Sequence, residues 1–103
     1  MPVLVEVVPA ARACRYFVTY AAIGLPFRLI GPIEGEQALN RNTFIRAWFD
    51  DGERLIGFDK LVHADVELSH RYFYDEDGAL LSALVTMAGE APVRVTLPEI
   101  GAE

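Results

Sequence analysis

The chain has 103 residues, of which 52% are hydrophobic, and its formal net charge is −6 at pH 7. This length corresponds to one domain, residues 1–103. No run approaches the roughly 18 consecutive apolar residues of a membrane-spanning helix, and an acidic chain repels phosphate backbones. We therefore expect neither a membrane protein nor a nucleic-acid-binding protein. The single cysteine, Cys14, excludes an internal disulfide and predicts a cytoplasmic location.

The first 42 residues predict strands and one irregular connection. Residues 3–8 are apolar and lie between two prolines, which is typical of an edge strand. Residues 15–30 are aromatic and β-branched with a Gly and a Pro near the middle, which predicts a hairpin with an irregular turn, ended by Gly31-Pro32. Residues 34–42 are the least β-like, and we expect a loop there with at most one helical turn.

Two Asp-Gly pairs, Asp51-Gly52 and Asp77-Gly78, predict tight turns because both residue types tolerate a positive φ. Each pair lies between apolar runs that predict hairpin strands, and Gly89 to Pro92 separates a last strand. The strands expected around these turns cover residues 43–50, 54–58, 80–87 and 93–97. Residues 98–103 are expected to form a loose tail.

A long run without Gly or Pro, residues 60–74, lies between the two Asp-Gly turns. From residue 62 to residue 69, apolar residues at even positions alternate with polar residues at odd positions. Strict alternation predicts one strand with a buried face and a solvated face. Because strands of this length are unusual, we expect a bend or bulge near residues 57–60 or 69–70.

These elements predict an all-β domain, a curled antiparallel meander or small open barrel of about seven or eight strands. Arg46 and Arg71 begin similar phrases 25 residues apart, and Arg15 begins a weaker third phrase. Such a hairpin-sized repeat is typical of a meander. The three arginines are expected to pair with acids on adjacent strands, and a ligand-binding row is the alternative.

Residues 73–80, Phe-Tyr-Asp-Glu-Asp-Gly-Ala-Leu, resemble a unit of the YD-type β-hairpin repeats. This resemblance covers the second half of the chain and implies a turn, with no activity attached. Residues 14–20, 40–44 and 66–72 are similar to a family of short uncharacterised bacterial proteins. That similarity also brings no catalytic motif.

Aromatic residues occur in adjacent pairs, so rings are expected on both faces of the sheet. One face can form the core, whereas the other would expose an apolar patch of the kind that binds partners. The candidate interaction residues are Trp48, Phe49, Phe73 and Tyr74. A second candidate site lies under the 34–42 loop, where an apolar wall and arginine donors could hold a small molecule. Its candidate ligand-binding residues are Tyr20, Arg41, Arg46 and Trp48.

His63, Asp65 and Glu67 would share one strand face if the alternating run were a single strand, and they are candidate metal ligands. A solvated acidic face is the favoured reading, because neighbours along a flat strand rarely converge on one ion. No cofactor is therefore expected. The sequence also has no phosphate loop, nucleophile elbow or Ser-His-Asp signature, so catalysis is not predicted.

Nine acids and three basic residues lie between residues 50 and 77, which places the negative charge on the two hairpins. We expect a small interaction protein or accessory subunit that binds another protein, or itself, through an aromatic sheet face and this acidic rim. A small-molecule-binding β domain is the first alternative. A metal-dependent enzyme is the second.

Overall fold

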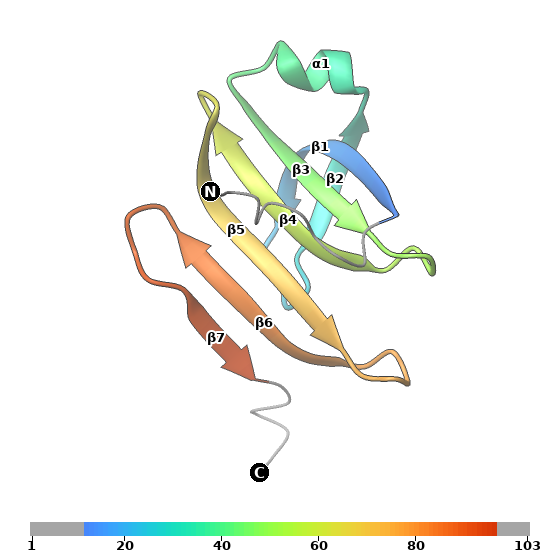
Figure 1. Ribbon diagram of the computed structural model, residues 1–103. Helices are drawn as coiled ribbons and strands as arrows, with labels where there is room; N and C mark the ends of the chain where they lie inside the picture. Colours follow the sequence, from blue (N-terminus) through green and yellow to red (C-terminus); the bar gives the residue numbers. More distant parts are fainter. Residues whose placement is uncertain (1–11, 97–103) are drawn as a thin grey trace.

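Seven antiparallel strands and one short helix make up residues 12–96, the part of the chain that the computed structural model describes. The strands form one open sheet in the order β2-β1-β3-β4-β5-β6-β7 (Figure 1). Their bounds are β1 Ala13–Ala21, β2 Arg28–Ile33, β3 Thr43–Phe49, β4 Leu55–Val62, β5 Asp65–Tyr74, β6 Leu80–Met87 and β7 Val93–Thr96, and α1 is Gly35–Leu39.

The all-β prediction is confirmed, and the sheet does not close into a barrel. From β3 to β7 the chain is a meander, whereas β1 pairs with β3 and leaves β2 at the edge. The expected helical turn is α1, the one helix among residues 12–96, which is too short to cross a membrane. The strand expected at residues 3–8 and the tail at 98–103 lie outside the described residues.

Both predicted turns are present, and an aspartate upstream of each Asp-Gly pair organises the turn. In the second turn Gly78 has the expected positive φ, of 90°, whereas in the first turn the positive φ, of 66°, is at Glu53 and not at Asp51 or Gly52. Asp50 Oδ1 accepts hydrogen bonds from the backbone N–H groups of Gly52 at 2.9 Å and Arg54 at 3.0 Å. Asp75 Oδ1 accepts in the same way from Asp77 and Ala79. The hydrogen bonds from Arg54 and Gly52 stabilise the carboxylate and lower the pKa of Asp50.

The alternating run does not form a single strand, and that prediction was wrong. His63 and Ala64 have φ angles of 51° and 73° and form a two-residue turn that separates β4 from β5. This left-handed pair is the backbone of a tight hairpin, but it lacks the Gly, Asn or Asp that normally marks one. A bulge at Lys60/Leu61 then shifts the register between these strands.

Gly31-Pro32 does not end the first hairpin as expected, because both residues lie within β2. Gly31 has a φ of +76°, which a glycine adopts without strain. Pro32 has no N–H to donate, and β2 is an edge strand that needs no donor on its outer side. The edge position explains why the strand continues through both residues.

The core lies on one side of the sheet, which we call the core face; its buried centre is Ile45, Ala47, Phe58, Tyr72 and Ala83. The β1–β2 hairpin curls over this face, so that Phe27 reaches β5 with its ring centroid 4.5 Å from that of His70. The Phe27 N–H donates to Tyr72 Oη at 3.1 Å. A second cluster of Ala38, Phe44 and Leu61 holds α1 against the other side. We call that other side the arginine face, after Arg46 and Arg71.

Candidate functional site

A groove of about 300 Å³ opens on the core face between the β1–β2 hairpin and the adjoining ends of β3 and β4. Five of its six lining residues are apolar, and three of these are phenylalanines. The lining residues are Phe17, Phe27, Leu29, Phe49, Glu53 and Leu55. The size and apolar lining of this groove would suit an apolar group of limited size.

An ion pair borders the groove through Glu53, which is one of its lining residues. Arg15 Nη1 and Nη2 each donate to one carboxylate oxygen of Glu53, both at 3.2 Å. The guanidinium carbon of Arg15 also lies 4.8 Å from the centre of the Phe49 ring. The groove therefore combines an aromatic wall with a charged pair that could orient a polar group beside a bound apolar one.

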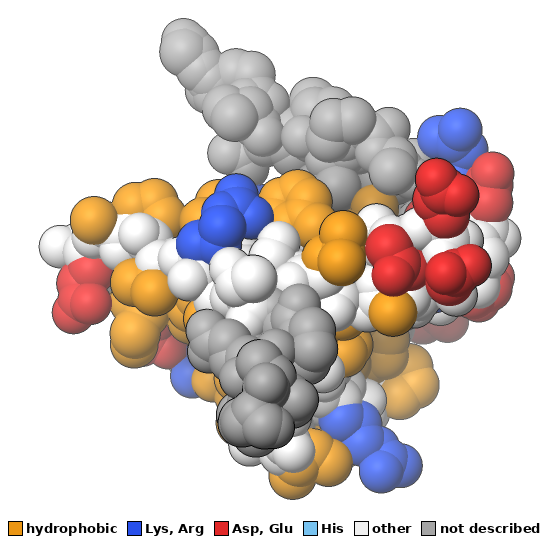
Figure 2. All heavy atoms as spheres, turned by 90° about the horizontal axis from the view of Figure 1, so that it is seen from below, with side chains coloured by type: hydrophobic (Ala, Val, Ile, Leu, Met, Phe, Trp, Pro, Cys, Tyr) orange, Lys and Arg blue, Asp and Glu red, His pale blue; other side chains and the backbone are white. Residues whose placement is uncertain are grey.

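The groove adjoins an acidic end of the molecule, which we define as the β3–β4 and β5–β6 turns. Figure 2 shows the acidic side chains gathered there. Six carboxylates belong to this end: Asp50, Asp51, Glu53, Asp75, Glu76 and Asp77. Arg54, Arg12 and Arg15 pair with Asp50, Asp51 and Glu53 respectively. Six carboxylates against three guanidinium groups leave a net charge of −3, and Glu76 and Asp77 are exposed without an ion pair in residues 12–96.

The second candidate site is a group of charged side chains on the arginine face, centred on Asp59, which is 2% exposed. Arg46 Nη2 donates to Asp59 Oδ2 from β3, and Arg71 Nη1 donates to Asp59 Oδ1 from β5, both at 3.0 Å. Trp48 lies beside both guanidinium groups, whose carbons are 5.4 Å and 4.9 Å from its ring centre. The expected pairing of Arg46 and Arg71 with an acid on an adjacent strand is confirmed, and they share the same acid.

Gly57 makes room for this cluster. A Cβ at Gly57 would lie 3.0 Å from Arg71 Cδ and 3.0 Å from the His70 carbonyl oxygen, closer than ordinary contact. Without a side chain at this position, Arg71 can cross β4 and reach Trp48, which is paired with Gly57. Gly57 therefore allows the side chain of Arg71 to pass close to the backbone of β4.

We expect Gly57→Ala to lower the free energy of unfolding by about 1–3 kcal/mol, because the added methyl group overpacks the site. It should also move Arg71 away from Trp48 and change the fluorescence of this tryptophan. Urea denaturation followed by fluorescence measures both effects. Gly52→Ala is the control, since its Cβ would meet only Asp50 Oδ1 at 3.6 Å. Equal stability of the two variants would contradict the steric role of Gly57.

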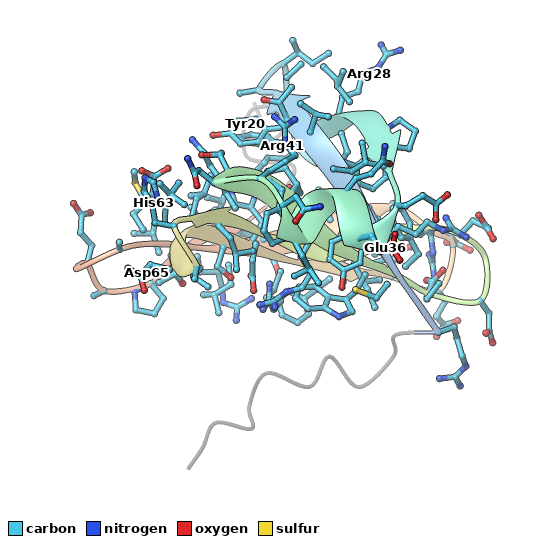
Figure 3. The ribbon with its side chains drawn as sticks, turned by 90° about the horizontal axis from the view of Figure 1, so that it is seen from above. Tyr20, Arg28, Glu36, Arg41, His63 and Asp65 are labelled. Atoms are coloured by element: carbon cyan, nitrogen blue, oxygen red, sulfur yellow. The ribbon has the colours of Figure 1, made fainter. Side chains whose placement is uncertain are left out.

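The four predicted ligand-binding residues lie in different places. Arg46 and Trp48 are together on the arginine face. Tyr20 packs against Phe27 on the core face. Arg41 turns back on its own loop, where its Nε donates to the Thr43 carbonyl at 3.0 Å (Figure 3). The groove therefore does not lie under the 34–42 loop, where the sequence had suggested a ligand.

The four predicted interaction residues are divided between the two faces. Phe49 lines the groove, and Tyr74 packs near it with its hydroxyl donating to the Leu55 carbonyl at 2.6 Å. Burial raises the pKa of Tyr74. Trp48 and Phe73 are on the arginine face, where the Arg94 guanidinium lies 5.2 Å from the Phe73 ring centre. Aromatic rings thus occur on both faces, as expected, but those on the arginine face are partly covered by arginines.

His63, Asp65 and Glu67 do not share a strand face. His63 is in the β4–β5 turn and Asp65 is the first residue of β5 (Figure 3). Glu67 pairs with Lys60 at 2.9 Å. The turn and the bulge separate the three side chains. In residues 12–96 no group of three potential metal ligands is close enough to hold an ion.

The sequence pointed to some of the residues at the two candidate sites: Phe49 in the groove, and Arg46, Trp48 and Arg71 on the arginine face. It did not single out Phe17, Phe27 or Asp59, and it assigned Glu53 only to the acidic rim. Asp59 carries the one available signal, because it is a carboxylate within the buried run Ile56 to Leu61 of β4. A buried charge requires a partner, and that requirement could have suggested the arginine cluster.

The family model described as a family of unknown function (DUF6156) matches residues 9–103. The chain belongs to this family. The comparisons with curated proteins and with solved structures give no match. Membership of the family agrees with the similarity to uncharacterised proteins, while the resemblance to YD-type repeats stays a prediction.

Proposed function

We propose that this protein binds a short segment of another protein, with one apolar side chain in the core-face groove and flanking Lys or Arg side chains at the acidic end. The observation that carries the proposal is the position of the groove, whose aromatic wall adjoins an end with a net charge of −3. Apolar burial would supply affinity, and the charge would select and steer a basic partner. We also propose a cytoplasmic location, because the single cysteine cannot form an intrachain disulfide.

A basic partner is favoured over a second copy of the chain. Two copies that met at the acidic end would bring two negative ends together, in a protein whose net charge is already −6. Like charges at an interface oppose association. A small amphipathic molecule is the second candidate, since a volume of about 300 Å³ is at the lower end for ligand pockets.

Selection from a random peptide library displayed on phage, with the purified protein as bait, tests the proposal. We expect enriched peptides to share one large apolar residue flanked by Lys or Arg. Synthetic versions of these peptides should shift the NMR signals of Phe17 and Phe49. No enriched motif, or an acidic one, would overturn the proposal, as would shifts confined to the opposite face.

Charge reversal at the acidic end provides the matched variants. Glu76→Lys with Asp77→Lys changes two exposed acids that have no ion pair in the described residues, so the fold should remain intact. We expect this double variant to bind the selected peptides about 3- to 10-fold more weakly at low salt. Glu36→Lys with Glu90→Lys makes the same change of +4 in net charge, on α1 and in the β6–β7 turn, both away from the acidic end (Figure 1), and should bind as the wild type does. Equal losses in both variants would show that only overall charge matters.

A further inference from the structure

The arginine face carries a positive charge that the rest of the acidic chain does not share. Around Asp59, the two guanidinium groups of Arg46 and Arg71 face one carboxylate, a net of +1. Arg94 lies on the same face but contacts Phe73 and Ser82, not Asp59. This face is opposite the groove, because successive residues of a strand point to opposite sides of the sheet. The positive cluster is therefore separate from the surface proposed to bind a partner.

The hydrogen bonds of Arg71 fix the orientation of its guanidinium group. Nη1 contacts three acceptors: the carbonyl oxygens of Phe58 at 3.3 Å and His70 at 2.8 Å, and Asp59 Oδ1 at 3.0 Å. Trp48 lies 4.9 Å from the guanidinium carbon. With one nitrogen held by three oxygens and a ring alongside, the guanidinium is oriented before any ligand arrives.

The other edge of the same guanidinium has no acceptor. No residue between 12 and 96 accepts from Arg71 Nε or Nη2. In that range the one buried side-chain donor without a partner is Arg46 Nε, so the free Arg71 donors contact solvent. The side chain of Arg71 is 23% exposed, which agrees with this. Two parallel N–H groups at the edge of a fixed guanidinium match the two oxygens of a carboxylate or phosphate.

We propose that Arg71, supported by Arg46 and Trp48, forms a binding site for a small oxyanion, a carboxylate or a phosphate group. Arg71 donates two hydrogen bonds to the anion through Nε and Nη2. Arg46 adds positive charge close to the bound anion. Its buried Nε–H has no acceptor and adds to the positive electrostatic potential at the site. Because the donors are partly solvated, we expect dissociation constants on the order of 1–10 mM for simple anions.

The wild-type protein provides a direct test through the NMR signal of the Arg71 Nε–H group. Sodium phosphate and sodium acetate are titrated separately at constant ionic strength, with sodium chloride as the balancing salt. Saturable movement of the Arg71 signal with either anion supports the site. The anion with the lower dissociation constant shows whether the site prefers a phosphate or a carboxylate. A linear drift shared by all arginines, or saturation only at Arg94, would overturn it.

Trp48 is the single tryptophan of the chain, so its fluorescence gives a second readout for variants. Arg71→Lys keeps the charge but removes the two parallel N–H donors, Nε and Nη2. We expect this variant to bind the anion at least about tenfold more weakly. Arg94→Lys is the matched control on the same face and should keep wild-type affinity. Unchanged affinity in Arg71→Lys would exclude the proposed pair of hydrogen bonds from Nε and Nη2. If this variant does not fold, as judged by circular dichroism, the wild-type Nε–H titration decides.

Discussion

Asp59→Ala is expected to lower the free energy of unfolding by about 3 kcal/mol. Removing this buried carboxylate leaves Arg46 and Arg71 without their shared partner, and breaking a buried ion pair costs about 3–5 kcal/mol. We place the loss at the lower end because the two arginine side chains keep 31% and 23% of their surface exposed. Urea denaturation at pH 7 measures the change.

Asp51→Ala is the matched control for Asp59→Ala. Asp51 also pairs with an arginine, Arg12, at 3.1 Å, but its side chain is 80% exposed. Solvent-exposed ion pairs contribute little, so we expect a loss of less than about 1 kcal/mol. Similar losses in the two variants would contradict the central role of Asp59.

The second large effect is a loss of stability in mild acid, caused by His70. This imidazole is 2% exposed and lies between the rings of Phe27 and Phe58, with centroids 4.5 Å and 4.6 Å away. Burial, and then the positive charge of Arg71, lowers the pKa of His70 from 6.5 to about 4. Tyr72 Oη accepts from the Phe27 N–H, so it is expected to donate its own hydrogen to His70 Nδ1, 2.6 Å away. This arrangement suits a neutral ring.

Between pH 6.5 and pH 4 the unfolded chain therefore binds a proton at this histidine that the folded chain does not. Stability from His70 is fully present above pH 6.5 and is lost as the pH falls toward 4. The difference in pKa corresponds to about 3 kcal/mol in total, of which about 2 kcal/mol should be lost between pH 7.5 and pH 5. Urea denaturation at a series of pH values within this range measures the loss.

His70→Asn removes the titrating group and can still offer an oxygen to the Tyr72 hydroxyl. We expect this variant to be less stable at neutral pH but to lose much less stability on acidification. His63→Asn is the control, because His63 is exposed and asparagine tolerates its φ of 51°. Its pH profile should match that of the wild type. If the free energy of unfolding of His70→Asn fell with pH as steeply as that of the wild type, other groups would cause the acid sensitivity.

The sequence predicted most of the elements, since their signals are local. Strand 80–87 has the bounds of β6, and the helical turn expected in residues 34–42 is α1. The β4–β5 turn was missed because it has no Gly, Asn or Asp, and because Ala64 takes a left-handed conformation that alanine rarely adopts. That turn also separates the candidate metal ligands, whose grouping depended on a single straight strand.

The candidate sites were less predictable, because they join residues that are distant in sequence. The groove brings Phe17 and Phe27 beside Phe49, which requires the β1–β2 hairpin to curl over the core face. Periodicity shows that a strand has an apolar side but not which hairpin covers it. The sequence therefore suggested an aromatic face and an acidic rim, without placing a groove between them.

The amino-acid sequence by itself determined the all-β class, the two Asp-Gly turns and the acidic character of the hairpins. These properties follow from the preferences of adjacent residues and from composition. Only the tertiary structure decided that Arg46 and Arg71 meet on Asp59, 13 and 12 residues away along the chain. Pairing of three strands in register brings these charges together, and Gly57 leaves the space in which Arg71 can cross to Trp48.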